Sequence, residues 1–266
     1  MSKANIVQIQ EKISLLKKKC SSIISITNYY NQMNLREKEF ETWIAESTII
    51  FWYEKMSISY VFFCSYDEKE LYHGLQQLPE KAVFHVASKN KDVTELWEKR
   101  TGYRLYSIYG RFGYTLGSLE EEKQRFASMK LDRFYDENLG YIAKKEDLLE
   151  IQELIYNNFD PFCDQLFSNE EMENLIENKN VWIEREGKEI CTIFIFQIEG
   201  KKYYANLALN RSTADVLHSI QKKSVLQAIE ENQVVYFYGW QALDNKQASR
   251  KHGYPDFDLY DYILRK

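Results

Sequence analysis

The chain has 266 residues, a length that fits one large domain or two smaller domains that each bury a core. Its 40 acidic and 35 basic residues give a net charge of −5, which argues against non-specific binding of nucleic acid, because such binding needs a basic surface. Hydrophobic residues make up 44% of the chain and only 10 glycines and 3 prolines are present, which excludes a mainly low-complexity protein.

No pattern near the N-terminus indicates secretion or a membrane anchor. The segment from Lys3 to Lys19 is polar and charged, and no apolar run approaches the length of a membrane span. The four cysteines form no C-x-x-C motif, and Cys64 and Cys191 fall in apolar runs, which predicts buried, reduced thiols. The four histidines lack metal-ligand spacing. We therefore expect a cytoplasmic protein with no membrane partner and no metal site.

The first part of the chain alternates helical and extended patterns. Apolar residues at helical spacing predict an amphipathic helix over Ile6–Leu16. Two apolar, aromatic and β-branched runs, Glu46–Tyr53 and Ser57–Ser65, predict a β-hairpin. A helix that begins at the N-cap residue Asp67 and a strand over Ala82–Val86 follow.

The second part of the chain carries a longer series of elements. Gly110, Gly113 and Gly117 predict a loosened segment before it, and the charged run Leu119–Tyr135 predicts a connecting helix. The elements predicted after this helix are a strand at Gly140–Ala143, helices at Lys145–Asn158 and after Ser168, a hairpin of Val181–Arg185 and Glu189–Ile198, a strand at Lys202–Leu209, a long helix at Ala214–Glu231, and strands at Val234–Tyr238 and Phe257–Leu264.

Two segments of the chain repeat one pattern. Ala82–Phe112 and Val234–Leu264 each consist of an apolar strand, a polar helix that ends at a Gly-Tyr pair, and a second strand. Matching residues, such as Gly102 and Gly253, are 151 positions apart. An order of elements that recurs at a constant offset indicates a duplicated unit.

The offset between the two copies is smaller earlier in the chain. Trp43 matches Trp182 at a distance of 139 positions, so the second copy holds 12 additional residues, about one strand and a turn. We therefore predict a first domain over 1–118 that lacks about one strand, a linker helix over 119–138, and a second domain over 139–266. Trp43 and Trp182 are expected to be buried at equivalent places.

The order of elements from Gly140 onward resembles the GNAT superfamily of N-acetyltransferases. The run GKEICTIFIFQIEGKKYYANLALN is similar to the two central strands of that family, and LDNKQASRKHGY resembles its pattern N-x-x-A-x-x-x-Y-x-K-x-G-F. The earlier run SKNKDVTELWEKRTGY is similar to the same ending. The resemblance implies an α/β fold with a mixed sheet, arranged as two GNAT-like domains in tandem.

The resemblance also implies a cofactor, acetyl-CoA or another acyl-CoA. In the family it lies between two splayed parallel strands, with its pyrophosphate on backbone N–H groups at the start of the long helix. This places Leu207, Ala208 and Leu209 beside the pantetheine arm. The family's glycine-rich phosphate loop is missing, since no glycine occurs between Gly200 and Gly239. Its place falls either on Gln221, Lys222, Lys223 and Ser224 or on Asn210–Ala214, and both assignments are open.

The catalytic positions depart from the family pattern as well. Members often use a tyrosine four residues before the Gly-Phe pair to protonate the departing thiolate, and Ser249 occupies that position here. Tyr238 and Tyr254 are nearby candidates to replace it, as is His252. Tyr204 and Asn206 are candidates to hold a water that accepts the proton of the amine.

Three functions agree with these patterns. The first is an N-acyltransferase that moves an acyl group from CoA to the amine of a small molecule or amino-acid-like acceptor, a reaction that depends mainly on orientation and on a polarised carbonyl. The second is a GNAT-fold binding or scaffold protein without catalysis, which the missing glycines and Ser249 favour. The third is an aminoacyl-tRNA-dependent transferase, which the acidic net charge disfavours.

Overall fold

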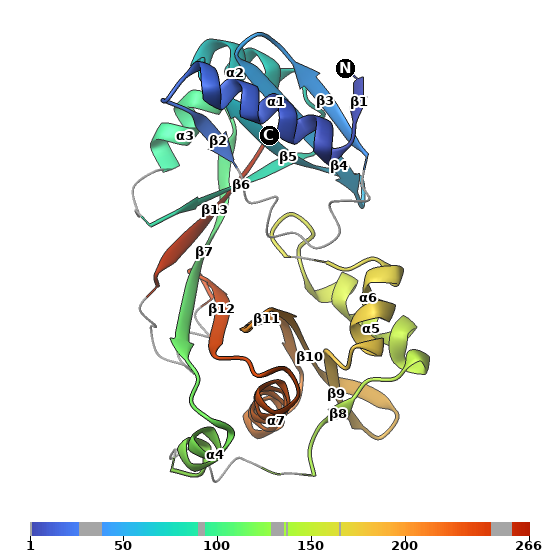
Figure 1. The fold of residues 1–266 in the computed structure, drawn as a ribbon. Helices are drawn as coiled ribbons and strands as arrows, with labels where there is room; N and C mark the ends of the chain where they lie inside the picture. Colours follow the sequence, from blue (N-terminus) through green and yellow to red (C-terminus); the bar gives the residue numbers. More distant parts are fainter. Residues whose placement is uncertain are drawn as a thin grey trace. The chain divides into compact units, whose positions relative to one another are not determined.

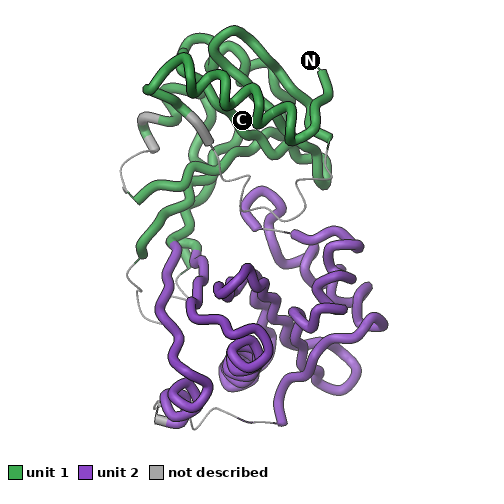
Figure 2. Tube along the Cα trace, viewed as in Figure 1, with its two compact units in different colours: residues 1–110, 242–266 green, residues 111–241 purple. Residues whose placement is uncertain are grey.

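A computed structural model describes residues 2–26, 39–89, 94–128, 136, 138–164, 166–245 and 257–266. The chain forms two compact units, which Figure 2 colours separately. Unit 1 holds Met1–Gly110 and Ala242–Lys266, and unit 2 holds Arg111–Gln241. The last strand of the sequence therefore belongs to the same unit as the first, although the domain boundaries predicted from the repeat place it in the second domain.

Unit 1 is a mixed sheet covered by helices (Figure 1). Its elements are β1 (Ser2–Ala4), α1 (Ile6–Lys19), β2 (Ile24–Ile26), β3 (Phe40–Ile44), β4 (Thr48–Lys55), β5 (Ile58–Ser65), α2 (Glu68–Gln76), β6 (Ala82–Ser88), α3 (Thr94–Thr101), the first part of β7 (Arg104–Thr115), and β13 (Leu259–Arg265). The strands pair in the order β1-β3-β4-β5-β6-β13-β7, with β2 beside β5. β5 and β6 are parallel, whereas β6 and β13 are antiparallel.

The sequence patterns explain the elements of unit 1. The helix predicted at Ile6–Leu16 is confirmed, and the apolar residues at its helical spacing are buried. Asn5 caps this helix, because its side chain accepts a hydrogen bond from the backbone N–H of Gln8. The predicted hairpin is confirmed as β4 and β5, and Cys64 is buried in it.

The strands of unit 2 are also part of a mixed sheet. Its elements are the end of β7, α4 (Leu119–Ser128), β8 (Tyr141–Ile142), a 3-10 turn (Lys145–Asp147), α5 (Leu148–Asn158), α6 (Asn169–Glu177), β9 (Val181–Glu186), β10 (Glu189–Glu199), β11 (Lys202–Asn210), α7 (Ala214–Asn232) and β12 (Tyr236–Ala242). The strands pair in the order β7-β12-β11-β10-β9-β8. Only β11 and β12 are recorded as a parallel pair in this series, and the mixed α/β fold predicted from the sequence is confirmed.

Each face of the unit 2 sheet carries an apolar cluster. On one face, Ile220 of α7 belongs to the same cluster as Phe194 and Tyr203. On the other face, residues of α5 and α6 such as Met172 form a cluster with Ile195. Neighbouring residues of a strand point to opposite faces, so β10 contributes to both clusters. Figure 1 shows α7 and the pair α5–α6 on different sides of these strands.

Two expectations of the sequence need correction. Gly110 and Gly113 do not loosen the chain, because both lie inside β7. A Cβ atom on Gly113 would lie 2.6 Å from Cδ1 of Tyr238, so this glycine allows an aromatic ring to lie against the strand. Trp182 is buried, as expected, but Trp43 is only half-buried and lies near the end of its strand. No helix among the described residues has the length and apolar character needed to span a membrane.

Candidate functional site

The parallel strands β11 and β12 pair over only part of their length. Recorded partners run from Lys202 and Tyr236 to Ala205 and Gly239, although β11 continues to Asn210. The register between β10 and β11 shifts at the same level, where Asn206 is passed over. Among the described residues, no strand is recorded beside β11 in place of β12 beyond Ala205. This edge of β11 can therefore offer backbone groups to an extended ligand.

The predicted pantetheine contacts lie on this part of β11. Leu207, Ala208 and Leu209 follow the last β11–β12 pair and remain bound to β10 on their other side. Leu207 is buried and Ala208 is exposed, in agreement with side chains that alternate between the two faces. The backbone of this segment is thus fixed by β10, which is the condition for a preorganised binding edge.

The turn from β11 to α7 is held by the side chain of Asn210. Its Oδ1 accepts hydrogen bonds from Thr192 Oγ1 at 2.9 Å and from the Ser212 backbone N–H at 3.1 Å. Its Nδ2 donates to the Thr213 carbonyl oxygen at 3.0 Å. The Arg211 N–H donates to the carbonyl oxygen of Cys191 at 2.8 Å. These bonds to β10 fix where the first turn of α7 begins.

The start of α7 has free capacity for an anion and also an opposing charge. Thr213 is the N-cap residue, and its side chain makes no capping hydrogen bond among the described residues. The positive end of the helix dipole lies there, next to the exposed residue Arg211. Asp215 in the first turn acts in the opposite direction, because its carboxylate repels phosphate.

The second candidate for the phosphate site lies inside α7 and not at its start. Lys223 Nζ donates to the carbonyl oxygens of Leu139 and Gly140 at 3.0 and 2.7 Å. Lys222 is buried, with its Nζ 5.6 Å from the ring centroid of Phe126. The backbone carbonyl oxygen of Gln221 accepts a hydrogen bond from the Ser224 hydroxyl. The Ser224 hydroxyl is also hydrogen-bonded to the Tyr203 hydroxyl, at 2.8 Å. A cofactor role for these four residues stays a prediction.

One predicted catalytic residue lies where the β11–β12 pairing ends. Tyr238 is opposite Tyr204, and their rings stack with centroids 5.5 Å apart. Burial raises the pKa of Tyr204, because the charged phenolate is poorly solvated there. Ser249 and Tyr254, the other two predicted catalytic residues, lie outside the described residues. Asn206 donates from Nδ2 to Gln197 Oε1 at 2.6 Å.

Arg111 is a contact of this site that the sequence did not indicate. Its guanidinium carbon lies 4.9 Å from the centroid of Tyr238. The contact depends on β7 lying beside β12, a pairing between segments that are far apart in the sequence. No local pattern around Arg111 predicts that pairing.

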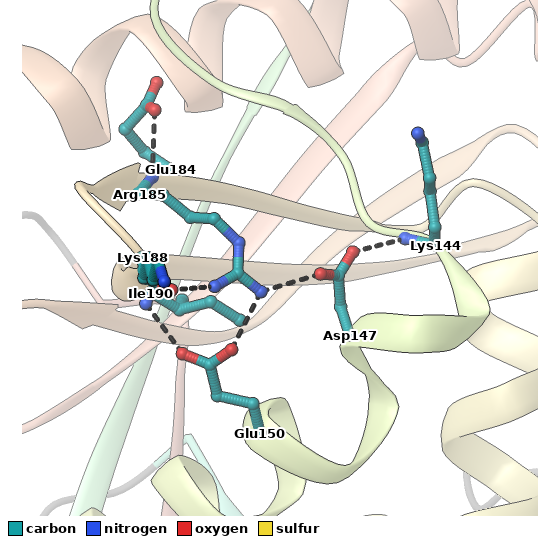
Figure 3. A network of polar contacts seen from close by, with 7 residues as sticks. All are labelled: Lys144, Asp147, Glu150, Glu184, Arg185, Lys188 and Ile190. Atoms are coloured by element: carbon teal, nitrogen blue, oxygen red, sulfur yellow. Dashed lines mark hydrogen bonds and ion pairs between the residues drawn. The ribbon is translucent and has the colours of Figure 1, made fainter.

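A polar network supports the opposite part of the unit 2 sheet (Figure 3). Arg185 on β9 donates from Nη2 to Asp147 Oδ1 at 2.7 Å and is paired with Glu150 Oε2 at 2.8 Å. Glu150 also accepts the backbone N–H of Ile190 at 2.8 Å, and Asp147 accepts that of Lys144 at 2.8 Å. The Asp147 bond is the main cause that raises the pKa of Arg185. The network joins the start of α5 to the β9–β10 hairpin.

Comparison with known proteins supports the fold. No family model and no curated protein matches the sequence. Among solved structures, an acetyltransferase of the GNAT family from Colwellia psychrerythraea aligns over 100% of both chains, with a TM-score of 0.51 and 10% identity. The chain has a GNAT-like fold. The fold resemblance inferred from the sequence is thereby confirmed.

Two further solved structures match with the same TM-score. A GCN5-related N-acetyltransferase from Sphaerobacter thermophilus aligns over 83% of this chain and 76% of its own, with a TM-score of 0.51 and 10% identity. A conserved protein of unknown function from Staphylococcus epidermidis aligns over 90% of this chain and 97% of its own, again at 0.51 and 10%. At an identity this low, the structural alignments establish a shared fold alone, and function has to be argued from the site.

Proposed function

We propose that this chain is an acyl-CoA-dependent N-acyltransferase that acylates the amine of a small molecule, and that unit 2 holds its cofactor. The observation that carries the proposal is the parallel β11–β12 pair, which stops at Ala205 and Gly239 although β11 continues to Asn210, shortly before α7 begins at Ala214. In a GNAT-like fold this is where the resemblance places acyl-CoA. We also propose that the chain is a tandem of two GNAT-like copies.

The residues of unit 2 fit this cofactor in two respects. The edge of β11 at Leu207–Leu209 can bind the amides of a pantetheine arm, and the first turn of α7 with Arg211 can bind a pyrophosphate. Two features restrict the fit. The turn contains no glycine, so close approach of the backbone to phosphate is limited, and Asp215 adds a negative charge. We therefore expect Arg211 to contribute more than the corresponding side chain of a glycine-rich loop.

Bound acyl-CoA supplies an activated thioester, and the chain supplies orientation and a proton. Tyr204 and Tyr238 lie at the end of the β11–β12 pairing, next to the edge that would hold the pantetheine arm. A protonated phenol there can donate its proton to a departing thiolate, although burial, which raises the pKa of Tyr204, makes that phenol a weaker acid than usual. Ser249 and Tyr254 remain proposed contributors to the same step.

A protein without catalysis, which uses the same fold for binding or as a scaffold, is the second candidate. Asp215 at the helix start and the missing glycines favour it. The two candidates differ in a single measurable property, since a scaffold that has lost the cofactor site binds no acyl-CoA.

Calorimetric titration with acetyl-CoA and with free CoA tests the proposal. We expect both ligands to bind, and Arg211→Glu to weaken binding at least tenfold, about 1.4 kcal/mol, because it places a carboxylate beside a polyanion. Lys69→Glu is the matched control, since Lys69 is exposed in the first turn of α2, the helix of unit 1 that corresponds to α7. Acetyl-CoA that produces neither heat nor a thermal shift at millimolar concentration would refute the proposal.

A double variant decides between the two phosphate sites. If Asn210–Ala214 holds the pyrophosphate, Lys222→Gln combined with Lys223→Gln leaves the affinity for acetyl-CoA within about threefold. If the interior of α7 holds it, the double variant weakens binding by tenfold or more, the step expected for lost phosphate contacts. A thermal melt of each variant confirms that it is folded.

A further inference from the structure

Four aromatic side chains gather on one face of β11 and β12. Tyr236, Tyr238 and Trp240 alternate along β12, which places them on the same face, and Tyr204 of β11 is opposite Tyr238. The ring of Tyr238 lies between those of its neighbours, 5.5 Å from Tyr204 and 6.5 Å from Tyr236, and both pairs are stacked. We call these four residues the aromatic row.

Two residues of the aromatic row are exposed and the other two, Tyr204 and Tyr238, are half-buried, whereas Tyr203 on the other face of the same strands belongs to the core. Tyr203 and Phe237 stack at 5.4 Å on that other face, and Tyr203 has no exposed surface. In the row, Tyr236 is 43% exposed and Trp240 is 37% exposed. Large apolar side chains that cluster on a surface, rather than occurring singly, mark a binding site.

Several groups of unit 2 lie close to the rings of the aromatic row. The planar guanidinium of Arg111 lies over Tyr238, and Gly113 allows β7 to pass close to the same ring, which fixes its position. At the other strand, the charged groups that influence Tyr204 are Lys202 and Glu199, one of each sign. The row therefore presents fixed, flat ring surfaces, and the guanidinium over Tyr238 shows that a flat group can lie against them.

We infer that the aromatic row binds the acceptor, and that the acceptor is a primary amine carried on a planar aromatic ring. This inference rests on the proposed function, because the row runs along the β11–β12 pairing from Tyr236, opposite Lys202, to Trp240, which follows the last pair beside the proposed cofactor edge. A ring stacked on the row would hold its amine next to that edge. The amine nitrogen then forms a bond to the thioester carbonyl carbon as the carbon–sulfur bond breaks, and the proton that the amine loses balances the one that the thiolate gains.

Two primary amines, one with a planar aromatic ring and one with a saturated, puckered ring, test the inference. Benzylamine and cyclohexylmethylamine have similar size and carry the same primary amine, and their binding is measured by saturation-transfer NMR without cofactor. We expect benzylamine to bind roughly three- to tenfold more tightly, the range expected for one aromatic pair. Tyr236→Leu combined with Trp240→Leu should remove this preference. Tyr141→Leu should keep it, because Tyr141 is equally exposed but lies on β8, three strands further along the sheet.

Each result has a defined meaning. Equal binding of the two amines, or a preference that survives in the double variant, would overturn the inference. If the double variant does not fold, the single variants Tyr236→Leu and Trp240→Leu give the same comparison. Calorimetry with acetyl-CoA is carried out separately, so a failure of cofactor binding counts against the proposed function and leaves the amine result standing. We expect the row variants to bind acetyl-CoA as the unchanged protein does.

Discussion

The two units treat the gap between their central parallel strands in opposite ways. In unit 1, β5 and β6 pair only at Ser59–Ala82 and Tyr60–Val83, and β2 then pairs with β5 at Phe63–Ser65, while β4 occupies the other edge of β5. In unit 2, β11 and β12 separate after Ala205, and no described strand takes the corresponding place. A backbone edge that is already paired has no free N–H or C=O groups for a ligand, so of the described parts of these strands it is β11 of unit 2 that keeps an unpaired edge.

The helices α2 and α7, which follow β5 and β11, differ in the capping and charge of their N-terminal ends. At the start of α2, Asp67 accepts a hydrogen bond from the Glu70 N–H at 2.9 Å, and Glu68 and Glu70 add negative charge. Burial would raise the pKa of Glu70, but hydrogen bonds from Ser47 outweigh it and lower the pKa, so the charge is retained. At the start of α7, Thr213 makes no side-chain cap among the described residues. The start of α2 therefore carries a side-chain cap and two acidic residues, whereas the start of α7 lacks the cap and has Asp215 as its acidic residue.

The largest effect that tests the comparison concerns the two tryptophans. Trp182 is buried, so Trp182→Ala should cost about 3–5 kcal/mol in the free energy of unfolding. Trp43 is half-buried, and Trp43→Ala should cost less, about 1–2 kcal/mol, because less of the ring is removed from water. Urea unfolding of both variants measures the difference. Equal losses would mean that the two positions are equivalent after all.

A cap grafted onto α7 should make unit 2 resemble unit 1. Thr213→Asp adds a carboxylate where α2 has Asp67, which should stabilise the helix by about 1 kcal/mol. The same carboxylate should compete with phosphate for the N–H groups, so we expect a higher melting temperature together with weaker binding of acetyl-CoA.

Thr213→Ala controls for the loss of the threonine itself. It adds no charge and no cap, so the affinity for acetyl-CoA should stay within about twofold, far from the tenfold step of a lost phosphate contact. Tighter binding in Thr213→Asp than in Thr213→Ala would show that the phosphate does not lie at the start of α7.

The smallest effect depends on pH and concerns how β13 is held in unit 1. His85 Nδ1 of β6 lies 2.8 Å from Asp261 Oδ2 of β13. Burial lowers the pKa of His85, but the Asp261 carboxylate outweighs burial, so the folded-state pKa is raised above the ordinary histidine value of 6.5. The pair therefore stabilises the fold fully below pH 6.5, and this contribution is lost as the pH rises through the folded-state pKa.

Asp261→Asn should accordingly destabilise the protein more at pH 5.5 than at pH 8.5, pH values set roughly one to two units on either side of an ordinary histidine pKa. Denaturant unfolding at both pH values measures the difference. Asp244→Asn, at an exposed aspartate of the turn after β12, is the control and should show no such dependence. A loss of stability that is the same at both pH values would show that Asp261 does not stabilise the fold through the charge of His85.

Sequence alone determined most of the elements and the fold class, but it did not predict the strands β1, β2 and β3. The helical spacing of Ile6, Ile9, Ile13 and Leu16 and the apolar runs of β4 and β5 are local patterns, and the structure forms them where the patterns predict. The order of elements from Gly140 carried the resemblance of fold, because a fixed series of strands and helices permits few arrangements. The absence of glycines from the phosphate loop was also visible, because residue types are read directly from the sequence.

Tertiary structure decided which unit keeps an open edge and which residues surround it. β2 has only three residues, and its place beside β5 depends on a pairing across about forty positions. The membership of β13 in unit 1, the contact of Arg111 with Tyr238 and the exposure of Trp240 likewise arise from pairing between distant segments. Alternation along β12 fixes which residues share a face, but only the neighbours of a strand determine which face is buried, and those neighbours are set by long-range packing.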